Sequence, residues 1–184
     1  MMRVLVPLAQ GCEELEAVTI IDLLRRAEIE VVTAGLTDGP VTASRGTVLV
    51  PDTTLAAVVD QMFEMIVLPG GLPGAQYLEE DSRLYTMLRR HAEQGAYTAA
   101  ICAAPKVLAV AGVLDDRQAT CYPGCVAPDA FPRLTLIDAP VVTDGRVITG
   151  RGPGAAMDFA LELIAALVGP ERRDQVEAAL IRSH

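Results

Sequence analysis

The sequence predicts a single α/β domain built on a doubly wound, mostly parallel β-sheet sandwiched by helices. Short apolar runs alternate with longer amphipathic segments along most of the chain, as in successive β–α–β units. Several of the runs are apolar at consecutive positions, as strands covered on both faces must be. The 184 residues contain no internal repeat, low-complexity tract or linker long enough to divide them, so we expect one domain over residues 1–184.

The apolar runs predict the strands. We expect them at residues 3–8, 29–36, 64–71, 97–102, 118–122 and 146–150. The segment GPVTASRGTVLVPD at residues 39–52 combines turn residues with short apolar stretches, and we expect it to form a small antiparallel excursion.

The amphipathic segments predict the helices. We expect them at residues 13–27, 81–95, 152–169 and 170–183. The start and stop signals agree with this, since an Asp-Ser pair opens 81–95 and a glycine closes it. Pro105 opens a further helical pattern directly after the strand at 97–102.

Charge and hydropathy exclude several classes of partner. The formal net charge is −9, so the phosphates of nucleic acid and an anionic membrane surface would both repel the chain. The longest apolar region is interrupted by Pro105 and Lys106, so we expect no membrane span. The N-terminal apolar run is too short for a signal peptide, and four cysteines in a leaderless chain favour free thiols in a reducing cytoplasm.

Three predicted strand ends carry residues that could take part in catalysis or binding, in the stretches QGCEELE, LPGGLPGAQ and AICAAP. In parallel sheets, ligands bind at the carboxyl ends of the strands. Cys102 stands where a buried strand gives way to a helix, and a helix N-terminus favours the thiolate form of cysteine. The alternative is packing, because free cysteine is among the most buried residue types.

Glu16 is the carboxylate most suited to work with this thiol. It lies between Leu15 and Val18 in the first turn of the first predicted helix, so it can point inward among apolar neighbours. Burial beside a thiolate would raise the pKa of its carboxyl and let it transfer protons near neutral pH. The alternative is an ordinary glutamate at a helix start.

The glycine loops do not fit nucleotide binding. Residues 70–75, GGLPGA, lack the Gly-Lys-Ser/Thr ending of a P-loop, and residues 150–157 contain only part of a dinucleotide fingerprint. A better use of Gly70 and Gly71 is close backbone approach, with amides free to donate to a developing oxyanion, although a plain turn remains the alternative.

Metal binding and histidine-dependent catalysis are both disfavoured. Cys121 and Cys125 are four residues apart, but no second pair has ligand spacing, so we expect no metal and interpret both as thiols without a role. His91 lies in a charged helical segment and is expected to be solvated, and His184 is the last residue. A cysteine peptidase needs a nearby imidazole, so we expect no peptidase.

These residues and motifs resemble the ThiJ/PfpI superfamily, and specifically its DJ-one (Parkinsonism-associated deglycase) branch. The resemblance covers nearly the whole chain, through GCEELEAVTIIDLLRRA, VTAGL, ASRGTVLVPD, IVLPGGLPGAQ, AAICAAP and GRGPGAAMDFALELIAAL in the order of the branch. It implies a flavodoxin-like fold and a homodimer. It also implies roles for eight positions: Cys102 as the reactive cysteine, Glu16 as its buried partner, Gly71 and Ala103 with Gly70 as the oxyanion site, and Arg26, Arg45 and Tyr122 around the substrate pocket.

Two departures from the family pattern matter. The peptidase-like branch has histidine directly after the cysteine, where this chain has Ala103. The human-type proteins have a histidine where this chain has Tyr122, and a phenol is a poor base at neutral pH.

The resemblance implies a cofactor-independent glyoxalase III or deglycase acting on methylglyoxal-type dicarbonyls or their early adducts on glycated side chains. The alternative is a redox-sensing or chaperone-like stress protein whose Cys102 is oxidised to sulfinate. In either case we expect Cys102 to be the one thiolate at neutral pH, and the other three cysteines (Cys12, Cys121 and Cys125) to keep ordinary thiol pKa values of about 8.5.

Overall fold

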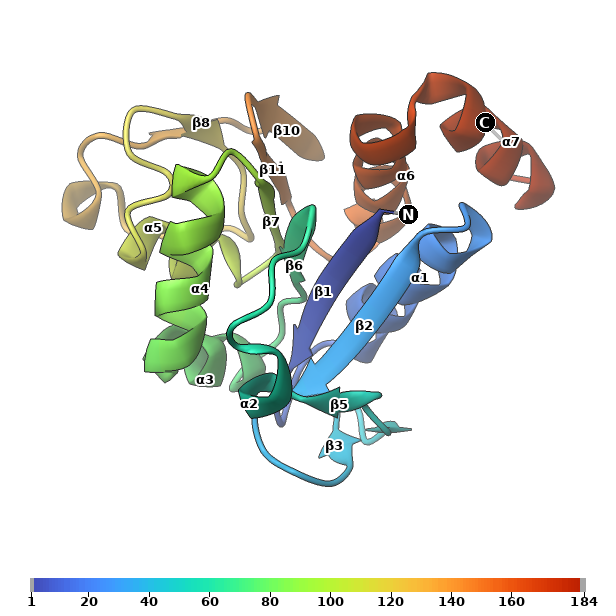
Figure 1. The fold of residues 1–184 in the computed structure, drawn as a ribbon. Coiled ribbons are helices and arrows are strands. Elements are labelled where there is room, and N and C mark those ends of the chain that lie inside the picture. Colours follow the sequence, from blue (N-terminus) through green and yellow to red (C-terminus); the bar gives the residue numbers. More distant parts are fainter. Residues whose placement is uncertain (1, 183–184) are drawn as a thin grey trace.

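A seven-stranded sheet forms the centre of the computed structural model, which describes residues 2–182 (Figure 1). The strand order is β10-β11-β7-β6-β1-β2-β5, and every neighbouring pair is parallel except β10–β11. The strands span β1 Arg3–Leu8, β2 Glu30–Gly35, β5 Thr53–Thr54, β6 Met65–Leu68, β7 Tyr97–Ile101, β10 Val141–Asp144 and β11 Val147–Gly150. The predicted mostly parallel, doubly wound sheet is therefore confirmed.

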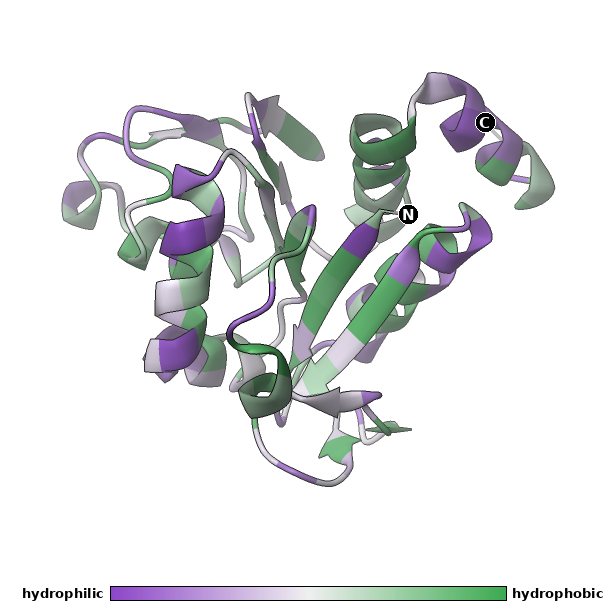
Figure 2. Cartoon of the chain, viewed as in Figure 1, coloured by the Kyte–Doolittle hydropathy of each residue, from purple (hydrophilic) through white to green (hydrophobic). Residues whose placement is uncertain are grey.

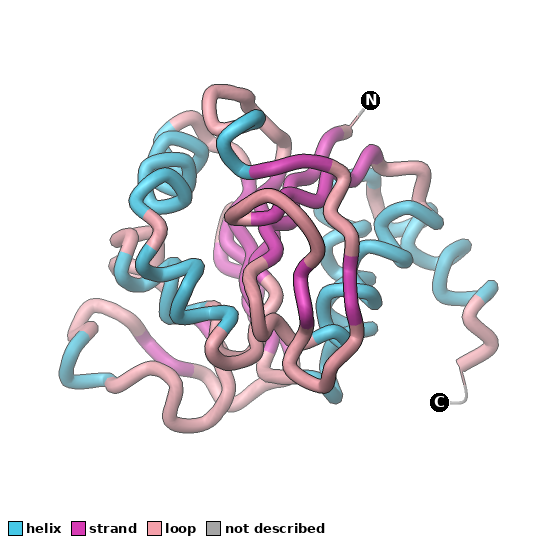
Figure 3. The backbone as a smooth tube through the Cα atoms, turned by 90° about the horizontal axis from the view of Figure 1, so that it is seen from below, coloured by secondary structure: helices cyan, strands magenta, loops and turns pink. Residues whose placement is uncertain are grey.

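Helices cover both faces of this sheet (Figures 1 and 3). One layer holds α1 (Glu14–Arg26), α6 (Ala156–Val168) and α7 (Pro170–Ala179), and the other holds α2 (Leu55–Val58), α3 (Gly74–Glu80), α4 (Ser82–Glu93) and α5 (Pro105–Val110). The period of two along each strand explains the two layers: Val4 and Val6 pack toward α1 and α6, while Leu5 between them packs toward α3 and α4. Figure 2 shows the resulting apolar strands at the centre of the molecule.

Most predicted elements have the expected positions. The strand at 3–8 is confirmed residue for residue, and the helices at 13–27 and 81–95 form with ends one or two residues shorter. The Asp81 side chain caps α4 by accepting from the backbone N–H groups of Arg83 and Leu84, as the Asp-Ser signal predicted. The excursion at 39–52 is the hairpin β3 (Val41–Thr42) and β4 (Val48–Leu49).

Two predictions about the C-terminal half were wrong or incomplete. Residues 118–122 do not add a strand to the central sheet: only β8 (Gln118–Ala119) forms, and it pairs with β9 (Thr135–Leu136) in a separate sheet. Strand β8 ends before Thr120, whose polar groups bind elsewhere: its N–H donates to Thr149 Oγ1 and its hydroxyl donates to the carbonyl of Ala139. The helix expected at 152–169 begins with a 3₁₀ turn at Pro153–Ala155, and residue 183 of the last predicted helix lies outside the described residues.

Among residues 2–182, no helix is long and apolar enough to cross a membrane.

Candidate active site

The three chemically notable strand ends meet at the carboxyl edge of the sheet, the lower edge in Figure 1. β1 lies between β2 on one side and β6 on the other, so the connections after β1 and β6 leave in opposite directions. In open α/β sheets, such a change of direction marks the place outside the carboxyl strand ends where ligands bind. At this edge, α1 follows β1, the Gly70–Gly71 loop follows β6, and Cys102 follows the adjacent β7.

Cys102 occupies a strained turn. Its φ of 64° lies in the left-handed region, which costs a non-glycine residue about 1–2 kcal/mol. Three hydrogen bonds hold the conformation: Cys102 N–H donates to the carbonyl of Gly150 at 2.9 Å, its carbonyl accepts from Tyr122 N–H at 2.8 Å, and Ala104 N–H donates to Ile101 at 3.0 Å. The side chain is 9% exposed, so the thiol is accessible only to a small reactant.

Glu16 faces this thiol from α1. The buried stripe of α1 consists of Glu16, Ala17, Ile20, Leu23 and Leu24, and this helical spacing carries the carboxyl inward as predicted. Its Oε2 accepts from Gly70 N–H at 2.8 Å. Its Oε1 is buried without a hydrogen-bond partner among the described residues. A buried carboxyl oxygen left unpaired is costly, so the arrangement favours a protonated carboxyl that can donate to the neighbouring sulfur.

Gly70 is required by close approach. A Cβ atom at this position would lie 2.7 Å from Cys102 Cβ and 2.8 Å from Glu16 Oε2. The next residue, Gly71, has φ of 86°, and its N–H, together with that of Ala103, lies near enough to the Cys102 sulfur to lower the pKa of the thiol. The structure thus brings Gly70, Gly71, Ala103 and Glu16 together around Cys102.

Glu16 and Cys102 influence each other's ionisation. Burial raises the pKa of Glu16 to about 7, although the N–H of Gly70 and the neighbouring Cys102 thiol act against this. Burial and the ionised Glu16 raise the pKa of the Cys102 thiol to about 12, and the amides of Gly71 and Ala103 act against this. Protonation of Glu16 removes its negative charge and supplies a donor to the sulfur, so the thiolate forms only together with the neutral carboxyl.

The prediction that Cys102 is the one thiolate at neutral pH, favoured by the helix N-terminus and a neutral Glu16, was therefore wrong, because burial and the ionised Glu16 raise the pKa of the thiol. The helix that follows, Pro105–Val110, has only six residues, and the nearest charge is the carboxylate of Glu16. The expectation of ordinary values for the other thiols was also wrong. Burial raises the pKa of Cys12 to about 11, and it raises those of Cys121 and Cys125 as well.

Tyr122 lies at the rim of the site. Its backbone is bound to Cys102, while its phenol is half exposed and its ring packs over Gly152. A hollow of about 490 Å³ opens beside it, lined also by Pro140, Arg151, Pro153 and Asp158.

The two predicted pocket arginines lie at opposite ends of α1. Arg45 follows the β3 strand, and its backbone N–H donates to Glu14 Oε1 at 2.9 Å, which holds its loop against the first turn of α1. Arg26 is ten residues beyond Glu16 on the same helix, about 15 Å away at 1.5 Å per residue, and pairs with Asp22. Within this chain, Arg26 therefore does not lie beside Glu16, and a role in the pocket stays a prediction.

His91 is not solvated as predicted. It is completely buried, its Nδ1 lies 2.7 Å from the carbonyl of Met87, and its Nε2 accepts from Phe63 N–H at 3.1 Å. Phe63 precedes β6, so this histidine belongs to the opposite end of the sheet from Cys102. His184 lies outside the described residues.

One supporting residue was missed. The carbonyl of Gly150 holds the Cys102 amide, and a Cβ there would lie 2.9 Å from Ile101 Cγ1. The signal was a glycine that ends the apolar run RVITG next to the predicted cysteine strand.

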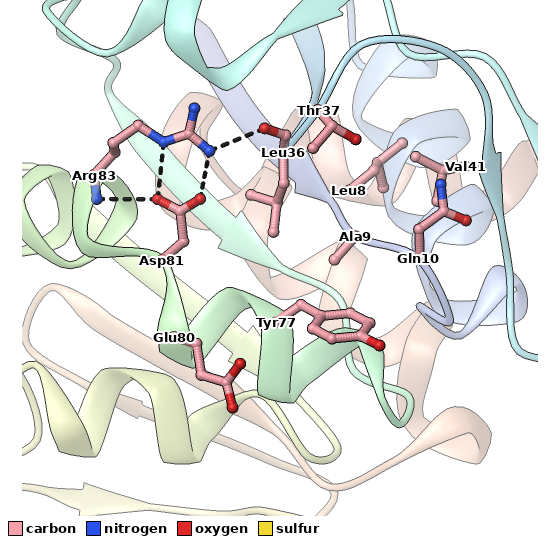
Figure 4. A pocket seen from close by; sticks show the side chains of 10 residues that line it. All are labelled: Leu8, Ala9, Gln10, Leu36, Thr37, Val41, Tyr77, Glu80, Asp81 and Arg83. Atoms are coloured by element: carbon pink, nitrogen blue, oxygen red, sulfur yellow. Dashed lines mark hydrogen bonds and ion pairs between the residues drawn. The ribbon is translucent and has the colours of Figure 1, made fainter.

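A second hollow, of about 290 Å³, opens between β1, β2 and α3 (Figure 4). Its main charged groups already serve the fold. Asp81 and Arg83 face each other, and Arg83 Nη2 donates to the carbonyl of Leu36 at 2.9 Å. This hollow contains none of the predicted site residues.

Comparison with known proteins agrees with this geometry. The model of the DJ-1/PfpI family matches residues 2–166. Drosophila melanogaster protein dj-1beta is 43% identical over 179 residues, covering 96% of this chain and 95% of that protein. The glutathione-independent glyoxalase DJR-1.2 of Caenorhabditis elegans is 34% identical over 167 residues, covering 91% and 89%. The chain spans only about half (46%) of the length of the Arabidopsis thaliana protein DJ-1 homolog A, to which it is 40% identical.

Solved structures give the same result. The crystal structure of Drosophila DJ-1beta superposes with a TM-score of 0.94 at 42% identity, covering 100% of this chain and 99% of that one. Oxidised Toxoplasma gondii DJ-1 superposes with a TM-score of 0.93 at 37% identity over both full chains. With a family match over most of its length and such similarity in sequence and fold, the chain belongs to the DJ-1/PfpI family.

Proposed function

We propose that this protein is a cofactor-independent glyoxalase that converts methylglyoxal-type dicarbonyls to hydroxy acids through Cys102 and Glu16. The observation that carries the proposal is the buried Glu16 carboxyl, with one oxygen unpartnered among the described residues, beside a thiol on a strained turn. The Caenorhabditis elegans relative named a glutathione-independent glyoxalase supports it.

The reaction begins with addition. In the reactive form of the pair, Glu16 holds the proton and Cys102 is a thiolate. The sulfur adds to the aldehyde carbon, the C=O bond becomes an oxyanion that accepts hydrogen bonds from the amides of Gly71 and Ala103, and Glu16 gives this oxygen its proton.

The second half of the reaction is a proton shift followed by hydrolysis. The Glu16 carboxylate removes the proton from the former aldehyde carbon and returns it to the adjacent carbon, which turns the adduct into a thioester. Water then cleaves the thioester, releases lactate and restores the shared proton to the pair. The balance is one dicarbonyl and one water consumed for each hydroxy acid formed.

We place free dicarbonyls before glycated side chains as substrate. The same thiol and carboxyl would act on either, but Cys102 is only 9% exposed, which favours a small molecule over an adduct on a protein surface. A peptidase is not proposed, because the buried His91 belongs to the far end of the sheet.

The direct test is turnover of methylglyoxal without glutathione, with lactate as the readout. We expect turnover by the wild-type chain and a loss of about 10⁴-fold or more in Cys102→Ser, with the thermal unfolding temperature retained. Cys121→Ser is the matched control and should retain turnover. Absence of lactate from well-folded wild-type protein would contradict the proposal.

A redox role is the second candidate. The Gly71 and Ala103 amides and a protonated Glu16 would stabilise a sulfinate on Cys102 as well as an oxyanion, and a relative at 37% identity has been solved in oxidised form. Mild peroxide should then give a sulfinate on Cys102, and this product should diminish in Glu16→Leu, because leucine has no hydrogen-bond donor whereas the amide of Glu16→Gln would keep one.

We also propose a cytoplasmic homodimer formed through the outer face of α1 and the β3–β4 hairpin. Leu15 and Val18 of α1 are exposed apolar residues, and Val50 beyond the hairpin is 80% exposed. Val18, Leu49 and Val50 line one hollow, so the apolar side chains are contiguous. Monomeric proteins rarely expose such patches.

Light scattering tests the dimer. The wild-type chain should have the mass of a dimer at micromolar concentration, and Val50→Glu should shift it to monomer. Ile181→Glu replaces another exposed apolar residue outside the patch and should leave the dimer intact. A monomeric wild-type chain would remove this proposal without affecting the proposed reaction.

A further inference from the structure

Cys121 and Cys125 flank a turn beside the active site. Cys125 N–H donates to the carbonyl of Tyr122 at 3.0 Å, which closes a β-turn over the sequence Tyr-Pro-Gly-Cys. Proline second and a glycine third with φ of 83° are the signature of a type II turn. Burial raises the pKa of the Cys121 thiol, and the N–H of Val126, the residue next to Cys125, acts against this, so the chain after the turn returns toward the first thiol.

The two thiols have different surroundings. Cys121 is buried, whereas Cys125 is partly exposed and lines a hollow of about 370 Å³ with Ala103, Lys106 and Gly124. Burial raises the pKa of the Cys125 thiol, and the positive charge of Lys106, which is paired with Glu79 at 3.1 Å, offsets part of this. A small oxidant that enters this hollow reaches Cys125, which lines it, before the buried Cys121, which does not. Cys102 is separately engaged with Glu16.

We propose that Cys121 and Cys125 form a dithiol pair that a hydroperoxide converts to an intrachain disulfide, independently of Cys102. The Cys125 thiolate attacks the O–O bond, which yields a sulfenic acid on Cys125 and an alcohol. The Cys121 thiol then attacks this sulfur, the S–S bond forms and water leaves. Two thiols lose two electrons and the hydroperoxide gains them. A dithiol reductant restores the pair, as expected of cytoplasmic disulfides that serve redox chemistry.

The bridge would act on the active site through the turn. Its ring contains Tyr122, whose N–H holds the carbonyl of Cys102 at 2.8 Å, and Cys125 shares a hollow with Ala103. The disulfide therefore braces the segment that supports the strained cysteine, and it gives oxidant a reversible target next to a thiol whose own oxidation to sulfinate is not reversed by thiols.

Peptide mass spectrometry tests the pair. Trypsin releases residues 118–133, which contain Cys121 and Cys125 but neither Cys12 nor Cys102. After one equivalent of hydrogen peroxide, iodoacetamide and digestion, this peptide should have lost two hydrogen atoms and carry no alkyl group, in the wild-type chain and in Cys102→Ala alike. Dithiothreitol before alkylation should restore two alkylated thiols, and Cys125→Ala should abolish the product.

Three outcomes would overturn the proposal. One is a peptide 118–133 with both thiols alkylated under conditions that oxidise Cys102. Another is a cross-link between Cys102 and Cys121, which would make Cys102 the primary thiol. The third is a disulfide that forms no faster in the folded chain than in a synthetic peptide of residues 118–133, because the fold would then contribute nothing.

Discussion

Glu16 and His91 are both completely buried titratable side chains, and the two ends of the sheet use them differently. At the amino end, both ring nitrogens of His91 have backbone partners, Met87 and Phe63. At the carboxyl end, Glu16 has one oxygen bound to Gly70 and the other without a partner among the described residues, next to Cys102. The first group is a satisfied part of the core, and the second retains a capacity for proton transfer.

The difference shows that burial of a titratable group does not by itself indicate a site. Burial lowers the pKa of His91 and raises the pKa of Glu16, and in each case it favours the neutral form. Only Glu16 also has an unpaired atom and a nucleophile on a strained turn beside it. The unpaired carboxyl oxygen and the strained turn lower the free energy of unfolding, whereas the fully paired His91 does not. Such a loss of stability is expected at a catalytic site.

Between the two buried groups, the larger expected effect on turnover comes from Glu16→Gln. The amide keeps the shape of the side chain and can still accept from Gly70, but it cannot carry a proton between two carbons. We expect lactate formation to fall about 10²-fold or more, while the unfolding temperature stays the same or rises. The matched control is Glu28→Gln, the same substitution at an exposed position beyond the end of α1.

Near-normal turnover in a well-folded Glu16→Gln variant would remove the difference between the two buried groups. Glu16 would then be, like His91, a residue of the core.

His91→Leu should have the converse effect. Leucine fills a similar volume but leaves Phe63 N–H buried without its acceptor, which costs about 2 kcal/mol of unfolding free energy. Turnover at saturating substrate should be unchanged. Urea denaturation measures the loss, and His91→Gln, which retains an acceptor, should lose less. A fall in turnover of tenfold or more in folded His91→Leu would show that the two ends of the sheet are coupled.

Sequence patterns were sufficient for the centre of the fold and for the core of the site. The spacing of apolar residues changes clearly at the ends of strand β1 and helix α1. Cys102, Glu16 and Gly70 could be found because the carboxyl ends of parallel strands must meet at one edge of the sheet. The short strands β5 and β10 were missed because neither is a long apolar run: β5 is defined by pairing with the more distant β2, and β10 is the edge strand of a hairpin with β11.

The errors in the site have equally physical causes. His91 was misplaced because charged neighbours hid its spacing of three and seven residues from the buried Leu88 and Leu84. Arg26 was assigned to the pocket by resemblance alone, and within one chain the rise of α1 places its backbone about 15 Å from that of Glu16, so its role stays a prediction. The pKa of Cys102 could not be predicted from the sequence, because it depends on the distance to a carboxyl contributed by another strand end.

The smallest expected effect is on the pH dependence of stability, where the two buried groups should act in opposite directions. The pKa of Glu16 is raised by folding, from 4.5 to about 7, so its contribution to stability is present below pH 4.5 and is lost as the pH rises through 7. The pKa of His91 is lowered by folding from 6.5, so its contribution is present above pH 6.5 and is lost as the pH falls.

Urea denaturation between pH 4.5 and 8 separates the two contributions. Relative to the wild-type chain, Glu16→Gln should gain stability as the pH rises through 7, because it no longer has a buried carboxyl to ionise. The difference in free energy of unfolding between the wild-type chain and His91→Leu should shrink as the pH falls below 6.5, because the variant has no imidazole to protonate. If the free energy of unfolding has the same pH dependence in Glu16→Gln and in the wild-type chain, the pKa of Glu16 is not raised by folding. Glu16 would then be ionised at neutral pH and could not donate a hydrogen bond to the Cys102 thiolate.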